Sequence, residues 1–129
     1  MTEEQKDDQL ARRIYSLIRA YVNQRTEEKS GIKYDDFRNS KDEKGHVQYP
    51  PAYREARERV CSDAFLAIRG RRERDFVDYF AGTICSVPQW LPEDDFIAVS
   101  QSLSTDWERV KTLSMLALSA QSYLGGSKD

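Results

Sequence analysis

The amino-acid sequence predicts an all-α fold, a single bundle of about five helices. Apolar residues recur at steps of three and four over most of the chain, which is the period of an amphipathic helix. No segment alternates between apolar and polar residues over a useful length, as a half-buried strand does. Prolines and glycines interrupt the pattern at a few positions, so the expected helices have clear ends.

The bulk composition is typical of a soluble globular domain. The 129 residues are 39% hydrophobic and 33% charged, which suits one domain with one core over residues 1–129. No apolar run approaches the roughly 20 residues that span a bilayer, and the opening MTEEQKDD lacks the order of a secretory signal. Cys61 and Cys85 lie in helical apolar patterns and match no metal-ligand spacing. We therefore expect a cytoplasmic protein with reduced core cysteines and no membrane contact.

The first helix is expected at about residues 4–27, because apolar side chains there fall on one stripe, Leu10, Ile14, Leu17, Ile18 and Tyr21. Residues 30–50 have no clean period and are rich in charge and turn formers, which predicts a long charged connector. We expect Ile32, Tyr34 and Phe37 to pack part of it against the bundle. Such long loops are more often functional or mobile than inert.

The second and third helices follow the connector. Pro50 and Pro51 suit a helix start, and the second helix runs to about residue 69 with an apolar face of Tyr53, Ala56, Val60, Ala64, Ala67 and Ile68. Gly70 can end or kink this helix. The third helix is expected at about 71–86, and its apolar side chains are Phe76, Val77, Phe80, Ala81 and Ile84.

A rigid turn between Pro88 and Pro92 separates the last two helices from the rest. Pro92 is followed by three acids, which favours a helix start there, and this fourth helix reaches about residue 102 with Phe96, Ile97 and Val99 inside.

Thr105 and Glu108 have the spacing of a capping box, which predicts a fifth helix opening at Trp107. Its apolar face continues until Gly125 and Gly126, leaving 125–129 as a tail, and consists of Val110, Leu113, Leu116, Ala117, Ala120 and Tyr123.

The charge distribution is uneven along the chain. Residues 53–74 contain seven arginines, no lysine and four acids, a net of +3, inside a protein of formal charge −2. Residues 75–129 hold three basic groups and eight acids, a net of −5. A planar guanidinium makes forked contacts with phosphate or carboxylate, which an ammonium cannot make. The sequence thus predicts one surface suited to a polyanion and another that repels it.

Two interpretations of the arginines remain open. In the first, the arginines form ion pairs with acids four residues away along a solvated helix: Arg54 with Glu58, Arg59 with Glu55, and Arg69 with Glu73. Asp75 and Asp78 can likewise pair with Arg71 and Arg74. Alternatively the arginines bind a phosphate backbone without reading sequence. The candidate phosphate-binding residues are Arg12, Arg19, Arg54, Arg57, Arg69, Arg71, Arg72 and Arg74.

Aromatic residues in the connector also have two interpretations. Tyr34, Phe37 and Tyr49 could stack on unpaired bases, which would favour single strands, or they could anchor the connector to the bundle.

The sequence offers little support for catalysis. His46 is the only histidine and lies in the polar connector with no fixed base or nucleophile beside it. Asp94 and Asp95 are adjacent, so on a helix they point about 100° apart and suit the helix dipole better than a metal ion. A glycine-rich phosphate loop is absent from the sequence. We expect a protein that is not an enzyme and needs no cofactor or metal.

A family resemblance is carried by residues 53–120, which begin YREARERVCSDAFLAIRGRRERDFVDYF and include VPQWLPEDDF, and by residues 13–33. These segments resemble the carboxy-terminal part of the large subunit of a type I-B (MYXAN-type) CRISPR Cascade complex. In several such systems this region is also made as a separate protein from an internal start and serves as the small subunit. A start at Met1 that runs straight into a helix fits that form.

The resemblance implies a helical bundle present in more than one copy. Its implied partners are the Cascade backbone and large subunits, further copies of itself and the target DNA, with crRNA as an open alternative. Such subunits bridge the complex and stabilise the R-loop, in particular the displaced non-target strand. The family supplies no motif that assigns DNA contacts residue by residue, so the candidate arginines rest on charge and helix geometry alone.

The leading hypothesis is therefore a non-catalytic small subunit of an RNA-guided surveillance complex, which holds the backbone of opened DNA while guide pairing supplies sequence specificity. The alternative is a purely structural spacer whose arginines pair with acids on neighbouring protein chains.

Overall fold

The structure, a computed structural model, describes residues 2–86 and 93–122. These ranges contain no strand, only an isolated bridge between Lys41 and Val47, and the all-α prediction is confirmed. The α-helices are α1 (Glu3–Ser30), α2 (Pro51–Arg69), α3 (Glu73–Gly82), α4 (Glu93–Leu103) and α5 (Trp107–Gln121), with short 3-10 helices at Tyr34–Asp36 and Ile84–Ser86.

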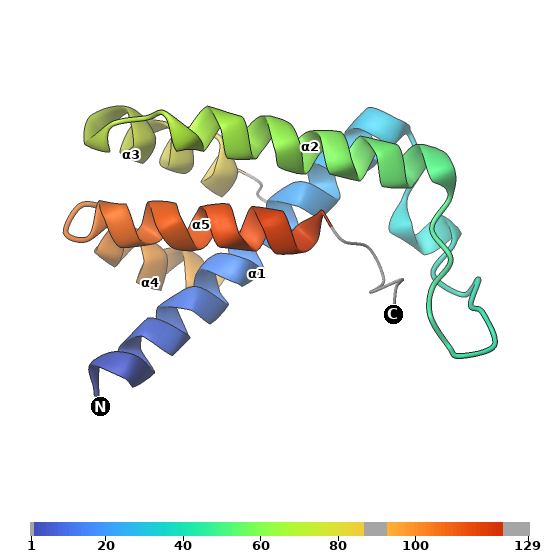
Figure 1. Ribbon diagram of the computed structural model, residues 1–129, viewed down its shortest axis with the longest axis horizontal. Helices are drawn as coiled ribbons and strands as arrows, with labels where there is room; N and C mark the ends of the chain where they lie inside the picture. Colours follow the sequence, from blue (N-terminus) through green and yellow to red (C-terminus); the bar gives the residue numbers. More distant parts are fainter. Residues whose placement is uncertain (1, 87–92, 123–129) are drawn as a thin grey trace.

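The long helices are arranged as an antiparallel pair crossed by a third helix. α2 and α5 run side by side in opposite senses, and α1 crosses them obliquely (Figure 1). α1 also contacts α4, and α3 follows the end of α2 and packs on α5. As a result the amino-terminal half of α1 lies below α5, whereas α2 and α3 lie above it (Figure 1).

Side chains from all five helices form one apolar core, which confirms most of the predicted stripes. The largest fully buried members include Ile14, Leu17, Ile68, Phe76, Phe80 and Leu118. The predicted burial of four residues is wrong. Ile97 is 47% exposed and Leu116 is 62% exposed, and Ala81 and Ala120 are also exposed. Helix periodicity gives the phase of a stripe but not its width, so residues at its edge remain in solvent.

Helix ends differ from the predictions in three places. A capping box of Thr2 and Gln5 opens α1, and Gly31 closes that helix in the left-handed conformation at φ 72°. The predicted capping box of Thr105 is wrong, because Asp106 occupies the N-cap and the Thr105 hydroxyl donates to the Gln101 carbonyl. α3 is shorter than predicted, because the α-helix ends at Gly82, with Thr83 as its C-cap, and a 3-10 helix follows at Ile84–Ser86. The predicted Pro88–Pro92 turn and the stop at residues 125–126 lie outside the described residues.

The connector packs against the start of α2. Phe37 and Tyr53 are 6% and 1% exposed and form a second apolar cluster with Ile32, Val47 and Tyr49. The tip is a short hairpin in which the Asp42 amide donates to the His46 carbonyl at 2.9 Å, and Gly45 supplies the positive φ of the turn. Phe37 and Tyr49 therefore anchor the connector.

Arg57 departs most from the sequence-based expectation. It is 6% exposed and its guanidinium contacts two other helices: Nε donates to the Gln121 carbonyl at 3.0 Å, Nη2 to the Gln121 side-chain oxygen, and Nη1 to Asn23 Oδ1. Every nitrogen of the fork is thus engaged inside the protein. The structure corrects the assignment of Arg57 as a phosphate-binding residue.

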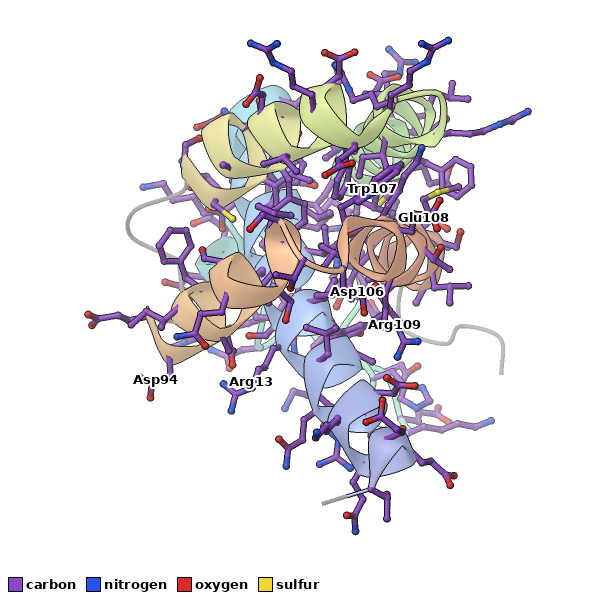
Figure 2. The ribbon with its side chains drawn as sticks, turned by 90° about the vertical axis from the view of Figure 1, so that its left-hand side faces the viewer. Arg13, Asp94, Asp106, Trp107, Glu108 and Arg109 are labelled. Atoms are coloured by element: carbon purple, nitrogen blue, oxygen red, sulfur yellow. The ribbon has the colours of Figure 1, made fainter. Side chains whose placement is uncertain are left out.

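Ion pairs fasten α4 and α5 to α1 on the side shown in Figure 2. Arg13 Nη1 lies 3.4 Å from Asp95 Oδ1, which holds the start of α4. Arg109 pairs with Asp7 of α1 and, at 3.4 Å, with Asp106 at its own helix start. No local pattern in the sequence predicts the contacts of Arg13 with Asp95 and of Arg109 with Asp7, because the partners are 82 and 102 residues apart.

Both cysteines are buried and free, as predicted. Burial raises the pKa of the Cys61 thiol to about 11 and that of the Cys85 thiol to about 12. Both thiols therefore stay protonated and unreactive at neutral pH. None of the described helices is long and apolar enough to cross a membrane.

Replacing Arg57 by alanine is expected to lower the free energy of unfolding by about 2–3 kcal/mol, because charged hydrogen bonds are lost and buried oxygens are left without donors. The matched control is Arg54→Ala on the exposed side of the same helix, which should change it by less than about 0.5 kcal/mol. Urea unfolding followed by circular dichroism measures both. Equal stabilities of the two variants would contradict the structural role of Arg57.

The cysteines give a pH-dependent prediction. Unfolded thiols ionise near their ordinary pKa, whereas the folded thiols ionise only near 11 and 12, so the unfolding free energy should fall as pH rises above about 9. At pH 8 a thiol reagent such as DTNB should label neither cysteine until denaturant unfolds the chain. Rapid labelling of the folded protein would show that the thiols are accessible.

Candidate nucleic-acid interface

The candidate arginines occupy three different environments. Arg57 is buried and Arg71 is partly exposed. The other six candidates are exposed on α1, α2 and the start of α3: Arg12, Arg19, Arg54, Arg69, Arg72 and Arg74. Arg59 of α2, which was not a candidate, is exposed as well. Only an exposed guanidinium with no internal partner is available to an external anion.

The expected pairs along the helices are not formed. Within residues 2–86 and 93–122, no ion pair within 4.0 Å joins Arg54 to Glu58, Glu55 to Arg59, or Arg69 to Glu73. The same holds for the expected partners of Arg71 and Arg74, Asp75 and Asp78. Pairing along the helix therefore does not account for the exposed arginines.

The outer face of α2 nevertheless carries mixed charge. Arg54 and Arg59 are exposed there together with the acids Glu55, Glu58 and Asp63, so with Arg57 buried the exposed acids outnumber the exposed arginines. This face is no better suited to a polyanion than an ordinary solvated helix surface.

Positive charge concentrates where α2 passes into α3. α2 ends at Arg69, the Arg71 amide donates to the Ile68 carbonyl at 3.0 Å, and Arg72 is the N-cap of α3. Residues 69–75 carry four arginines and two acids, a net of +2. The acids, Glu73 and Asp75, lie in the first turn of α3, where they complement the helix dipole.

α5 adds a further cation that the sequence analysis missed. The Lys111 ammonium donates to the Arg71 carbonyl and lies 5.6 Å from the centre of the Trp107 ring. No spacing rule could have found it, because residues 71 and 111 meet only through the packing of α3 on α5. We call the five residues Arg69, Arg71, Arg72, Arg74 and Lys111 the junction cluster.

Arg71 is held differently from the rest of the junction cluster. Its guanidinium carbon lies 4.3 Å from the centre of the Tyr79 ring, which is a cation–π contact. Burial raises the pKa of Tyr79 to about 12, with the Tyr21 phenol as the next cause, so the ring stays neutral. Arg69, Arg72 and Arg74 have no such contact among the described residues and remain exposed.

The two arginines of α1 do not join the junction cluster. Arg12 is exposed on the amino-terminal half of α1, which lies on the opposite side of α5 from α2 and α3 (Figure 1). Arg19 is exposed on the middle of α1. Burial raises the pKa of Tyr49 in the connector, and the nearby charge of Arg19 partly opposes this rise. The eight predicted arginines therefore do not form one continuous surface.

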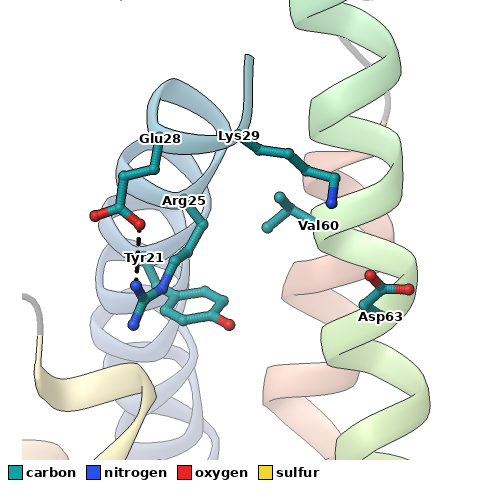
Figure 3. A pocket seen from close by; sticks show the side chains of 6 residues that line it. All are labelled: Tyr21, Arg25, Glu28, Lys29, Val60 and Asp63. Atoms are coloured by element: carbon teal, nitrogen blue, oxygen red, sulfur yellow. Dashed lines mark hydrogen bonds and ion pairs between the residues drawn. The ribbon is translucent and has the colours of Figure 1, made fainter. Parts of the chain in front are cut away.

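An open groove of about 330 Å³ lies between α1 and α2 (Figure 3). Its lining carries two cations, Arg25 and Lys29, and two acids, Glu28 and Asp63. Arg25 pairs with Glu28 at 3.0 Å and also lies over the Tyr21 ring. The charge of the groove is balanced, so it does not extend the junction cluster as a site for a polyanion.

The described residues offer little that is typical of a catalytic or metal site. No group of three or more His, Cys, Asp or Glu side chains in this part of the chain could hold a metal ion. His46 lies on the exposed hairpin, and its Nδ1 faces Asp42 Oδ2 at 3.6 Å.

Comparison with protein families identifies the family of the chain. The model of the type I-B CRISPR Cas8b C-terminal domain matches residues 1–121 of the chain. Neither a curated protein nor a solved structure matches it.

Proposed function

This chain belongs to the type I-B CRISPR Cas8b C-terminal domain family, and we propose that within the Cascade complex its junction cluster holds the phosphate backbone of target DNA. The family match makes the chain a type I-B Cascade subunit, or part of one. The further steps of the proposal are that the DNA is the displaced non-target strand of the R-loop and that the contact is independent of sequence.

The observation that carries the proposal is the set of exposed arginines at the α2–α3 junction. Arg69, Arg72 and Arg74 follow each other within six residues, and no acid in the described part of the chain lies within 4.0 Å of them. Unpaired guanidiniums close together bind successive phosphates well, because each makes forked, charge-assisted hydrogen bonds.

Sequence-independent binding is enough for this role. Base pairing with the guide RNA supplies sequence specificity in RNA-guided recognition, so a subunit that holds opened DNA needs only backbone contacts. Side chains on an exposed turn reach phosphates readily, whereas base readout requires an element placed in a groove of the duplex.

We also infer a non-catalytic role in the cytoplasm, alongside backbone and large subunits and further copies of the chain. The non-catalytic role is supported by the position of His46 on the exposed hairpin, where its ring faces Asp42, and by the burial of both thiols. The structural-spacer alternative shares the exposed arginines, because acids of a neighbouring subunit could pair with them equally well. Only an experiment that separates assembly from DNA binding distinguishes the two.

We predict that replacing Arg69, Arg72 and Arg74 together by alanine leaves assembly of the complex intact and weakens its DNA binding. Each phosphate contact releases counterions from the DNA on binding, so fewer are released when the contacts are lost. The magnitude of the slope of log affinity against log salt should therefore decrease by roughly 2–3. The measurement is target-DNA binding by the assembled complex at several salt concentrations.

The control replaces Arg12, Arg54 and Arg59, which removes the same charge from exposed positions outside the junction cluster. Its salt slope should stay close to that of the wild type. Equal slopes for the two triple variants would contradict the phosphate-binding role. Failure of the junction variant to assemble would support the spacer.

A further inference from the structure

Arg71 is the one arginine of the junction cluster that the protein holds in place. Its amide donates to the Ile68 carbonyl at 3.0 Å and its own carbonyl accepts from Lys111, so the backbone is fixed on both sides. Its side chain lies against Tyr79, 4.3 Å from the ring centre. Arg69, Arg72 and Arg74 are exposed, whereas Arg71 is only partly exposed.

Tyr79 is itself a fixed platform. It packs against the main apolar core and is only partly exposed, and Tyr21 of α1 lies close enough to its phenol to raise the pKa further after burial. Tyr21 carries the second arginine stack, with Arg25 at 5.4 Å from its ring centre. The ring under Arg71 is therefore supported from the α1 side.

The side chain of Arg71 is held by stacking and not by an ion pair. Its Nε is buried without a hydrogen-bond partner among the described residues, so the exposed part of the side chain lies elsewhere, and no carboxylate there lies within 4.0 Å of the guanidinium. A guanidinium held over a ring has already lost much of its rotamer freedom, so a second planar group can pack on its exposed part at a small entropic cost. Nucleobases are such planar groups, and they stack on arginine planes and aromatic rings in single-stranded complexes.

We propose that the Arg71–Tyr79 stack binds one unpaired nucleobase of a single strand, while the exposed arginines beside it hold the flanking phosphates. This inference rests on the proposed function and adds a base contact to it. A duplex cannot supply that contact without unstacking a base. The junction cluster should therefore prefer a single strand that carries bases over one that has only the sugar–phosphate backbone.

The test measures binding of the full chain by fluorescence anisotropy at fixed salt, using oligodeoxyadenylate and an abasic oligonucleotide of equal length. The wild type should bind the base-bearing strand about fivefold or more tightly than the abasic strand. Arg71→Lys keeps the charge but loses the planar group, so this ratio should fall to near one. The matched control, Arg72→Lys, changes an exposed arginine in the same turn and should keep the wild-type ratio.

Three results would overturn the inference. If the wild type bound the two strands equally, or if Arg71→Lys kept the wild-type ratio, the base contact would be contradicted. The proposed phosphate contacts would not be affected by either result. Absence of binding to either strand would overturn the stacking site and the proposed DNA contact together. Thermal unfolding followed by circular dichroism checks that Arg71→Lys is folded. A second variant, Tyr79→Leu, removes the ring and keeps an apolar side chain, and it should lower the ratio in the same way.

Discussion

The buried guanidinium of Arg57 determines how the three longest helices fit together. It extends from α2 to Asn23 of α1 and to both oxygens of Gln121, the last residue of α5. All its acceptors are neutral, and one is a carbonyl at a helix carboxyl end, where the helix dipole is negative. Because the donors of a guanidinium have a fixed planar geometry, the contact sets the rotation of α2 and its register along α5.

The position of the exposed arginines follows from this buried one. With Arg57 turned inward, Arg54 and Arg59 are turned outward among acids, and Arg69 comes at the end of the same helix. Gly70 ends α2, and the short turn into α3 brings the remaining arginines together. The register of α5 then places Lys111 against the Arg71 carbonyl. A core interaction thereby concentrates the charge at one end of the α2–α3 pair.

The sequence predicted what depends on local periodicity and missed what depends on distant contacts. Helix positions and most of the core follow from the 3.6-residue period, which each segment carries by itself. Arg57 was assigned to the surface because of its charge, although it follows Tyr53 by four residues and precedes Val60 by three, which places it on the apolar stripe. That spacing was a usable signal. Lys111 had no comparable signal, since its partner is 40 residues away and is a backbone carbonyl.

The absence of lysine from residues 53–74 has a physical explanation in this arrangement. Lysine could replace an exposed arginine as a point charge facing phosphate, but it could not fill the Arg57 site, which needs donors in a fixed fork, or place a planar group over Tyr79. Lys111 illustrates the difference, because its ammonium donates to one backbone carbonyl and lies over the Trp107 ring as a point charge, with no planar group of its own. The same arginine-rich segment thus supplies a buried guanidinium that joins three helices, a guanidinium held over a ring, and exposed cations, and only in the exposed positions could lysine supply the charge.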